Sequence, residues 1–326
     1  MATVPSGHPV QQLARARCTA PRPKPILSWS LKLPPFAYRA PESLEEGLEL
    51  LAAGDGEARV LAGGQSLIPM LALRLARPSL LIDLRRVRGL EGVQEDGGGL
   101  RIGALTTELV AERDPRVRAA SPLLFEALEF IGHPAIRSRG TVGGSLCHAD
   151  PAAELPAAAL VLGAELTARS LGRGERTIPA RDFFLGPFTT ALEFDEVVTE
   201  VRVPAPSSSQ GTCFAEVSRR PGDFAMVGVA AAVVRDEDRV LDLRLALTGV
   251  GDRSRLFTLD ELELDRQDSP ENLFSAAGRR VGARLRPPED LHASTAYRRH
   301  LSRVLTERAL RTAFGRAAVQ GGTAGG

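Results

Sequence analysis

Two short glycine-containing segments carry the residue types that could hold a phosphorylated ligand. The first is AGGQS, residues 62–66, which follows an apolar pair. The second is TVGGS, residues 141–145, in which Gly143 and Gly144 stand between two hydroxyl-bearing residues. Because glycine has no β-carbon, the backbone amides of such segments can approach a phosphate at hydrogen-bond distance. We therefore predict two loops that hold a diphosphate from both sides, although a glycine pair is also typical of an ordinary tight turn.

Other chemistry has no recognisable set of residues in this sequence. There is no Ser-His-Asp order, no motif of paired carboxylates and no Walker lysine, so hydrolysis and phosphoryl transfer are not predicted. A G-x-G-x-x-G between strand and helix is also missing, which argues against a Rossmann dinucleotide site. The reactivity must then come from a bound cofactor.

Cysteines and histidines give no metal or disulfide pattern. The three cysteines, Cys18, Cys147 and Cys213, are widely spaced and form no C-x-x-C pair. The five histidines never fall into H-x-x-x-H or H-E-x-x-H. We expect neither a disulfide framework nor an iron–sulfur or zinc site in this chain, and a reducing, cytoplasmic compartment.

Composition excludes several classes of partner. The chain has 326 residues, 43% of them hydrophobic, which is enough for two or three compact domains. With 41 basic and 40 acidic residues the net charge is +1, so neither nucleic acid nor an anionic membrane surface is favoured. The longest apolar stretch, residues 225–234, is far short of the roughly 18 residues that a spanning helix needs.

The elements around the two segments are predicted from periodicity and caps. Ser43 begins a helix as a capping box with Glu46, and Gly54 ends it. A second helix begins after Ser121 with Pro122 in its first position. The other predicted helices are 68–75, 156–162, 270–285 and 294–314, and the predicted strands are 59–61, 80–84, 100–107, 164–170, 197–203, 211–217, 227–235 and 240–250, with a linker at 204–210.

Longer stretches around the two glycine segments identify a family. AGGQSLIPMLALRLARP (62–78) and RGTVGGSLCHADPAAELP (139–156) lie in this order about 75 residues apart. They resemble the FAD-binding medium subunits of molybdenum hydroxylases, the xanthine dehydrogenase and aerobic carbon monoxide dehydrogenase family. The resemblance runs from about residue 32 to about residue 314 and includes AYRAPESLEE, LRIGALTT, SRRPGDFAMVG and STAYRRHL.

The resemblance implies an α+β fold. Two subdomains would form the FAD-binding fold of the vanillyl-alcohol oxidase and para-cresol methylhydroxylase type, followed by a C-terminal domain of antiparallel strands and helices. We accordingly expect a disordered N-terminal extension at 1–30, FAD-binding subdomains at 31–87 and 88–205, a C-terminal α+β domain at 211–316 and a disordered tail at 317–326.

Site residues follow from the resemblance position by position. It implies FAD contacts at Ala62, Gly63, Gly64, Gln65, Ser66, Leu67, Thr141, Val142, Gly143, Gly144 and Ser145. It also implies Glu154 as a hydrogen-bond acceptor for the ligand and Ile131 and Val198 as apolar neighbours of the flavin, although each would serve equally well in a helix start or a core.

Two more positions bear on the flavin. Asp223 lies in the matching GDFA, residues 222–225, as a structural or flavin-edge acceptor. Ala215 stands where some relatives have a lysine near the ring, so that positive charge is missing. For Cys147 and His148 we expect loop packing rather than chemistry, and no residue of the chain is assigned a catalytic role.

The implied function is that of an electron-transfer subunit. Non-covalent FAD would take electrons from a small subunit with [2Fe-2S] clusters and pass them to an external acceptor, while a large subunit with the molybdenum cofactor hydroxylates the substrate. The assembly would be a heterotrimer or a dimer of heterotrimers. Two alternatives stay open: a self-contained FAD-dependent oxidase or dehydrogenase of the same fold, and a flavin-free scaffold subunit.

Overall fold

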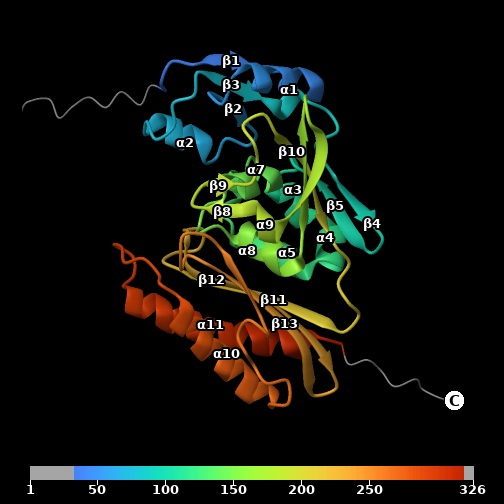
Figure 1. Ribbon diagram of the computed structural model, residues 1–326, viewed down its shortest axis with the longest axis vertical. Helices are drawn as coiled ribbons and strands as arrows, with labels where there is room; N and C mark the ends of the chain where they lie inside the picture. Colours follow the sequence, from blue (N-terminus) through green and yellow to red (C-terminus); the bar gives the residue numbers. More distant parts are fainter. Residues whose placement is uncertain (1–32, 319–326) are drawn as a thin grey trace, which may run out of the picture. The chain divides into compact units, whose positions relative to one another are not determined.

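The computed structural model describes residues 33–318 (Figure 1). The predicted extension at 1–30 and residues 319–326 of the predicted tail lie outside the described residues. Three sheets follow one another along the chain, each with its own helices. A two-stranded ribbon, β8 (Phe184–Gly186) and β9 (Thr189–Thr190), lies between the last strands of the second sheet.

The first sheet is parallel and has the order β1-β3-β2. Ser43 caps α1 by accepting a hydrogen bond from the Glu46 amide, as predicted, while the Glu46 carboxylate accepts one from the Glu42 amide. The apolar face of α1, including Leu48, is buried over the sheet. The elements are β1 (Ala37–Arg39), α1 (Leu44–Ala53), β2 (Ala58–Leu61), α2 (Leu67–Ala72), β3 (Leu80–Asp83) and the 3-10 helix η1 (Leu84–Arg86).

The second sheet is antiparallel and has the order β4-β5-β10-β6-β7. Its strands are β4 (Val93–Asp96), β5 (Gly99–Gly103), β6 (Glu165–Ser170), β7 (Gly174–Pro179) and β10 (Val197–Val203). Its helices are α3 (Glu108–Arg113), α4 (Pro115–Ala120), α5 (Pro122–Phe130), α6 (Pro134–Arg137), α7 (Val142–His148), α8 (Glu154–Leu162) and α9 (Ala180–Phe183). Strand β10 pairs with β5 and places Val201 opposite Ile102. The last strand of this sheet along the chain thus lies beside one of its first two.

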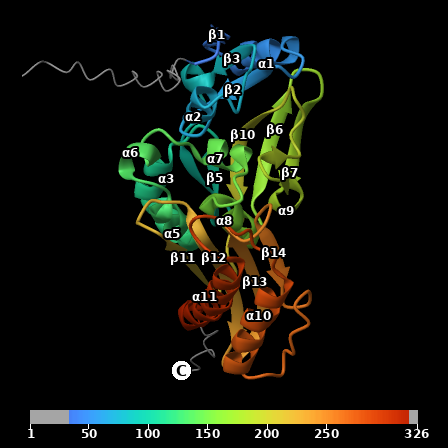
Figure 2. The same ribbon diagram turned by 90° about the vertical axis from the view of Figure 1, so that its left-hand side faces the viewer.

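The third sheet is antiparallel and has the order β11-β12-β13-β14. Its strands are β11 (Gln210–Ser218), β12 (Ala225–Asp236), β13 (Arg239–Thr248) and β14 (Arg255–Thr258). Helices α10 (Pro270–Arg284) and α11 (Thr295–Arg316) pack together on one face of this sheet (Figure 2). The other face of this sheet packs against α5 and α8, two helices of the second sheet.

Strand β12 is buried on both faces. Val229 and Val233 point into the core made with α10 and α11, while Ala230 and Ala232 belong to the core that contains α5 and α8. Successive side chains of a strand point to opposite faces, so this one strand contributes to two cores. The small alanine side chains allow α8 to lie close to the sheet.

Several predicted boundaries are wrong in detail. Residues 141–145, predicted as a loop, are the cap and first turn of α7. The predicted strand 100–107 already ends at Gly103, α8 begins at Glu154 rather than at residue 156, and the predicted linker ends one residue early because Gln210 belongs to β11. The predicted strand 197–203 coincides with β10.

Candidate cofactor site

The first glycine segment presents a run of free backbone donors. The N–H groups of residues 63–67 have no acceptor among residues 33–318. Gly64 has a φ of +73°, a conformation that L side chains rarely adopt, and it turns the chain from β2 into α2. Consecutive free amides at such a turn form a concave site for an anion. This segment therefore fits the diphosphate of a dinucleotide.

The second glycine segment presents no such donors. Thr141 is the N-cap of α7, and all four amides of residues 142–145 donate within the protein. The acceptors are Thr106 O, Ala104 O, Thr141 Oγ1 and Thr141 O, at 2.9 to 3.1 Å. The prediction of an open loop is wrong here because the first turn of a helix uses these amides. A ligand at this segment would contact its side chains rather than its backbone amides.

The two segments touch each other. A β-carbon on Gly63 would overlap the carbonyl oxygen of Arg139 and come within 2.9 Å of Gly140 Cα, and one on Gly144 would lie 3.6 Å from Ala62 Cβ. The structure thus brings together the two segments that sequence reasoning paired. A β-carbon on Gly143 would lie 2.6 Å from Ala104 Cβ, so the space predicted for a phosphate there is filled by the protein itself.

The predicted apolar neighbours of the flavin lie in the largest core. Ile131 is 9% exposed and ends α5, and Val198 is 5% exposed beside a register shift in β10. Val142 lies in the same core. In this position the side chains would exclude water from a neighbouring ring, but they also serve the packing of the second sheet.

Asp223 lies outside the two glycine segments, in the connection between β11 and β12 of the third sheet. It sits in an exposed turn and borders a cavity of about 560 Å³. Asp150 to Ala152 line the same cavity, together with Arg219 and Arg298. Asp223 is therefore available to a ligand in this cavity.

Ala215 and Glu216 face opposite sides of the third sheet. Ala215 packs against the core made with α10 and α11. Glu216 stands opposite Gly228, on the side of the sheet that carries Phe214 and Ala230 and faces α5 and α8. The acidic residue on the face toward α5 and α8 is therefore Glu216, which sequence reasoning missed.

Three buried glutamates have strongly raised pKa values. Burial raises the pKa of Glu154 to about 7, with a further contribution from the charge of Asp150. Burial and the charge of Glu154 raise the pKa values of Glu108 and Glu216 to about 8. At pH 7 the carboxyls of Glu108 and Glu216 are therefore mostly protonated, and that of Glu154 is about half protonated. Glu108 was also missed, because an acidic residue in the first turn of a helix is ordinary in a sequence.

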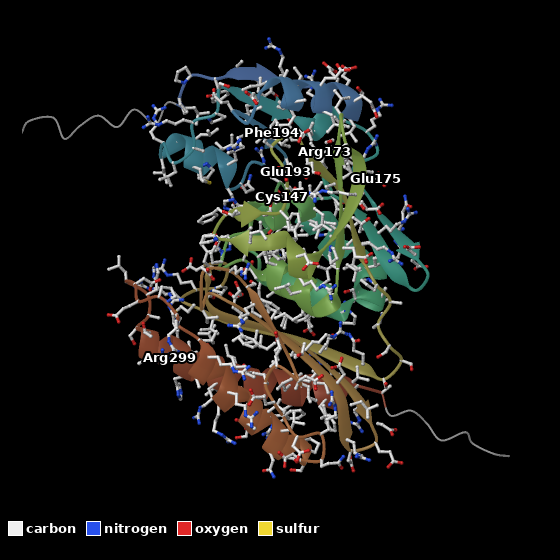
Figure 3. The ribbon with its side chains drawn as sticks, in the orientation of Figure 1. Cys147, Arg173, Glu175, Glu193, Phe194 and Arg299 are labelled. Atoms are coloured by element: carbon white, nitrogen blue, oxygen red, sulfur yellow. The ribbon has the colours of Figure 1, made fainter. Side chains whose placement is uncertain are left out.

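Cys147 and His148 have packing contacts. Cys147 lies on α7 and is labelled in Figure 3. Burial raises the pKa of its thiol to about 12, so this side chain is no nucleophile at neutral pH. The His148 ring lies 5.0 Å from the Phe188 ring, and burial lowers its pKa. Both observations agree with a role in packing.

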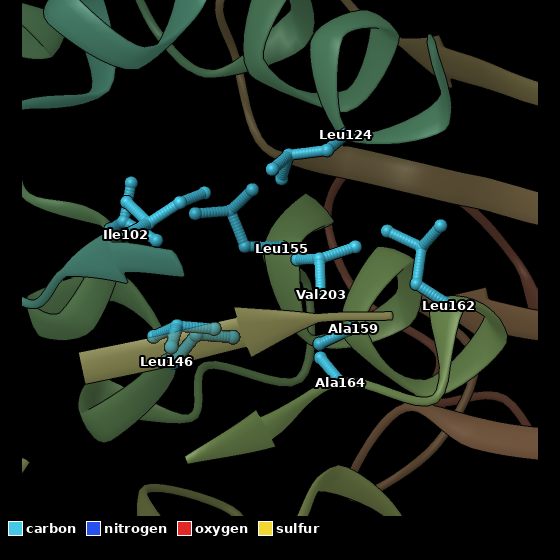
Figure 4. Close-up of a pocket in the computed structure, with 10 residues that line it drawn as sticks. Ile102, Leu124, Leu146, Leu155, Ala159, Leu162, Ala164 and Val203 are labelled. Carbon is cyan, nitrogen blue, oxygen red and sulfur yellow. The ribbon is translucent and has the colours of Figure 1, made fainter. Parts of the chain in front are cut away.

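A second cavity lies in the core and is too small for a ligand. It has a volume of about 10 Å³ and is lined only by apolar side chains, among them Ile102, Leu146 and Leu155 (Figure 4). An apolar space of this size has no polar partner even for one water molecule. It is a packing defect between the second sheet and its helices.

Residues 33–318 contain neither a candidate metal cluster nor a helix suited to cross a membrane. Within that range no group of three or more His, Cys, Asp or Glu side chains is placed to hold a metal ion. None of the helices formed by these residues is both long and apolar enough to cross a membrane.

Comparison with known families decides the identity of the fold. The model described as the FAD binding domain in molybdopterin dehydrogenase matches residues 34–206, and that of the CO dehydrogenase flavoprotein C-terminal domain matches residues 212–313. The chain belongs to the FAD-binding medium subunits of molybdopterin dehydrogenases. The predicted family and α+β fold class are confirmed, and the chain is an oxidoreductase subunit.

Individual members of this family match over nearly their whole length. The alpha subunit of the 6-hydroxypseudooxynicotine dehydrogenase complex of Paenarthrobacter nicotinovorans is 40% identical, over 88% of this chain and 97% of the relative. Carbon monoxide dehydrogenase medium chain of Hydrogenophaga pseudoflava is 37% identical, over 87% and 99%. A solved structure of carbon monoxide dehydrogenase from that organism, which lacks the Mo-pyranopterin moiety, superposes with a TM-score of 0.84 at 36% identity, covering 88% of this chain and 100% of its own.

Proposed function

We propose that this medium subunit binds FAD non-covalently and passes electrons from an iron–sulfur partner subunit through the flavin to an external acceptor. A large subunit with the molybdenum cofactor would complete a heterotrimer or a dimer of heterotrimers. The observation that carries the FAD part is the run of five free amides at residues 63–67, which lies against the 139–145 segment. The names of the relatives, a subunit of a complex and a medium chain, support the partner subunits.

The free amides would hold the diphosphate. The half-buried side chains of Gln65, Ser66 and Ser145 would supply further hydrogen bonds beside it. Together with these, we assign to the site Ala62, Gly63, Gly64 and Leu67 of the first segment and Thr141, Val142, Gly143 and Gly144 of the second. Val142, Gly143 and Gly144 act by placing the first turn of α7, since their amides are already engaged, and Thr141 acts as its cap.

Other residues would border the flavin. Ile131 and Val198 keep water from the ring, Glu154 offers a carboxyl at the start of α8, and Asp223 lies at the cavity beside the third sheet. FAD supplies electron-transfer chemistry when bound, and the chain binds it, orients it and sets its surroundings. A transfer of electrons between two protein-bound centres needs no catalytic acid or base from this chain.

The test of the FAD part is direct. The purified chain should carry FAD that trichloroacetic acid releases, with the absorption spectrum of an oxidised flavin and without stoichiometric iron, zinc or molybdenum. A folded, colourless protein that does not take up added FAD would support the scaffold alternative. Flavin that stays attached after acid precipitation would contradict non-covalent binding and turn attention to His148 and Cys147.

The electron path is tested by rapid mixing. Alone, the chain should leave its flavin oxidised in the presence of the organic substrate of the complex, because substrate chemistry belongs to the large subunit. Addition of the two partner subunits, co-purified from the native host, should restore substrate-dependent bleaching of the flavin. Bleaching by the isolated chain at an enzymatic rate, on the order of 1 to 1,000 per second, would establish the self-contained oxidase instead.

A further inference from the structure

Three glutamates, two of them buried and one half-buried, lie on three different elements with too few partners. Glu108 is the first residue of α3 and 4% exposed, Glu154 is the first residue of α8 and 5% exposed, and Glu216 lies on β11. The Oε2 atoms of Glu108 and Glu216 have neither solvent nor a hydrogen-bond partner among residues 33–318. A buried carboxylate oxygen without a partner costs free energy, so these groups are expected to hold a proton, to meet a ligand, or both.

Glu108 lies directly behind the point where the two glycine segments meet. Its amide donates to the carbonyl oxygen of Gly140 at 2.8 Å, and its carboxyl is so close that a β-carbon on Gly140 would overlap Oε2. Gly140 precedes the cap of α7 and also contacts Gly63. The carboxyl of Glu108 therefore supports the backbone of the site from its protein side.

Glu154 lies on α8, and Glu216 lies on β11 of the third sheet, which packs on α8. A β-carbon on Gly228 would lie 3.6 Å from Glu216 Oε2 and 2.6 Å from Thr248 Cγ2. The Thr248 hydroxyl donates to the carbonyl oxygen of Ala153 at 2.8 Å, next to Glu154. The charge of Glu154 raises the pKa of both other glutamates, so the three titrate as one coupled group.

We propose that Glu108, Glu154 and Glu216, the carboxyl cluster, border the cofactor site and that FAD binds to this cluster in its protonated form. The inference rests on the proposed function. The diphosphate of FAD carries negative charge, and ionised carboxylates beside the same site would repel it in a poorly solvated place. Because the Oε2 atoms of Glu108 and Glu216 have no exposed surface, the cluster would act on the bound FAD through its charge rather than through direct hydrogen bonds.

The other charged groups near the cluster are engaged or do not titrate in the same range. Arg137 pairs with Glu112, and Arg298 pairs with Asp290. Burial lowers the pKa of His148 below its ordinary value of 6.5, so it stays neutral above pH 7. The remaining groups are Asp150, which faces Glu154, and the pair Glu126 and Arg316, which lies between α5, β11 and α11.

The experiment measures FAD binding to the apo form of the full chain between pH 6 and pH 9. Titration calorimetry in two buffers with different protonation enthalpies gives the dissociation constant and the number of protons taken up. For the wild type we expect the dissociation constant to rise above pH 7, by about tenfold per pH unit for each proton that binding requires. The triple variant Glu108→Gln, Glu154→Gln, Glu216→Gln should bind FAD with less than a threefold change over the same range.

Controls separate the outcomes. Glu129→Gln removes an exposed carboxyl of α5 and should keep the wild-type slope. If the triple variant does not fold, Glu154→Gln alone should lower the number of protons taken up. A wild-type affinity that is constant from pH 6 to pH 9, or a triple variant with the wild-type slope, overturns this inference while FAD binding stands. A folded wild type that binds no FAD at any pH overturns the proposed function instead.

Discussion

Gly64 is the residue at which backbone conformation and ligand binding coincide. It has a φ of +73° and lies within the run of residues 63–67 whose amides have no acceptor among residues 33–318. A β-carbon there would lie 3.1 Å from both Ile68 Cγ1 and Leu61 Cδ1, so the cost of a side chain is mostly in the backbone. Gly89 has a φ of +84° in open space, which makes it a control with the same kind of strain.

Gly64→Ala should therefore weaken FAD binding, whereas Gly89→Ala should not. Each substitution forces a non-glycine residue into the left-handed region at a cost of about 1–2 kcal/mol. Only at position 64 would relaxation of that strain turn amides away from the diphosphate, and we expect at least a tenfold rise in the FAD dissociation constant. Fluorescence titration of both apo variants gives the answer. Equal affinities would show that the first segment is an ordinary turn.

For single residues, one part of the site could be predicted from the sequence and another part could not. The pairing of two glycine segments predicted a site that the fold does bring together, because each segment carries its own signal. In the carboxyl cluster only Glu154 was implied by the resemblance, whereas Glu108 and Glu216 carried no signal, because the three residues are far apart in the chain. Ala215 seemed to matter from its position beside a motif, yet strand alternation turns it away and presents Glu216.

Helix α7 is an element that tertiary contacts hold in place. Gly143 and Gly144 oppose a helix by about 1 kcal/mol each relative to alanine, which is why a loop was predicted. The Thr141 cap and the bonds from Val142 and Gly143 to Thr106 and Ala104 outweigh that preference. Elements with strong local signals, such as α1 and β10, were predicted correctly because local and tertiary preferences agree.

Gly143→Ala should consequently destabilise the whole protein rather than the cofactor site alone. The added methyl group would lie 2.6 Å from Ala104 Cβ and 2.7 Å from its carbonyl oxygen, so α7 must move away from the end of β5. Overpacking of this kind costs about 1–3 kcal/mol, and we expect a lower midpoint of thermal unfolding for the apo protein. Gly315→Ala, in α11 with nothing nearby, should raise the midpoint or leave it unchanged. An unchanged midpoint for Gly143→Ala would mean that the contact yields easily.

At the scale of the molecule, buried carboxyls should set the pH dependence of stability. The pKa values of Glu108, Glu154 and Glu216 are raised in the folded state to about 8, 7 and 8. Their contribution is present below the unfolded value of 4.5 and is lost as pH rises through the folded values. The free energy of unfolding should fall between pH 5 and pH 8, by up to about 1.4 kcal/mol per pH unit for each group. The midpoint of thermal unfolding of the apo protein should fall with it.

Two aspartates act in the opposite sense at low pH. Ion pairs and hydrogen bonds hold the pKa values of Asp83 and Asp290 at about 2, against burial. Their stabilisation is present above the unfolded value of 3.8 and is lost as pH falls toward 2. On these values the stability of the apo protein should be maximal near pH 4. The triple glutamine variant should flatten only the neutral side of this profile, and a symmetric loss on both sides would contradict the assignment.

Strand β12 has a consequence for how the chain can be divided. Its Val229 and Val233 belong to one core and its Ala230 and Ala232 to another, so the two faces of the third sheet belong to two different cores. A fragment cut in the segment 204–210 would uncover the apolar flanks of α5 and α8 that this sheet covers. Such a fragment would associate with itself in water. The flavin-binding half and the C-terminal half are thus two regions by sequence and one cooperative unit by folding.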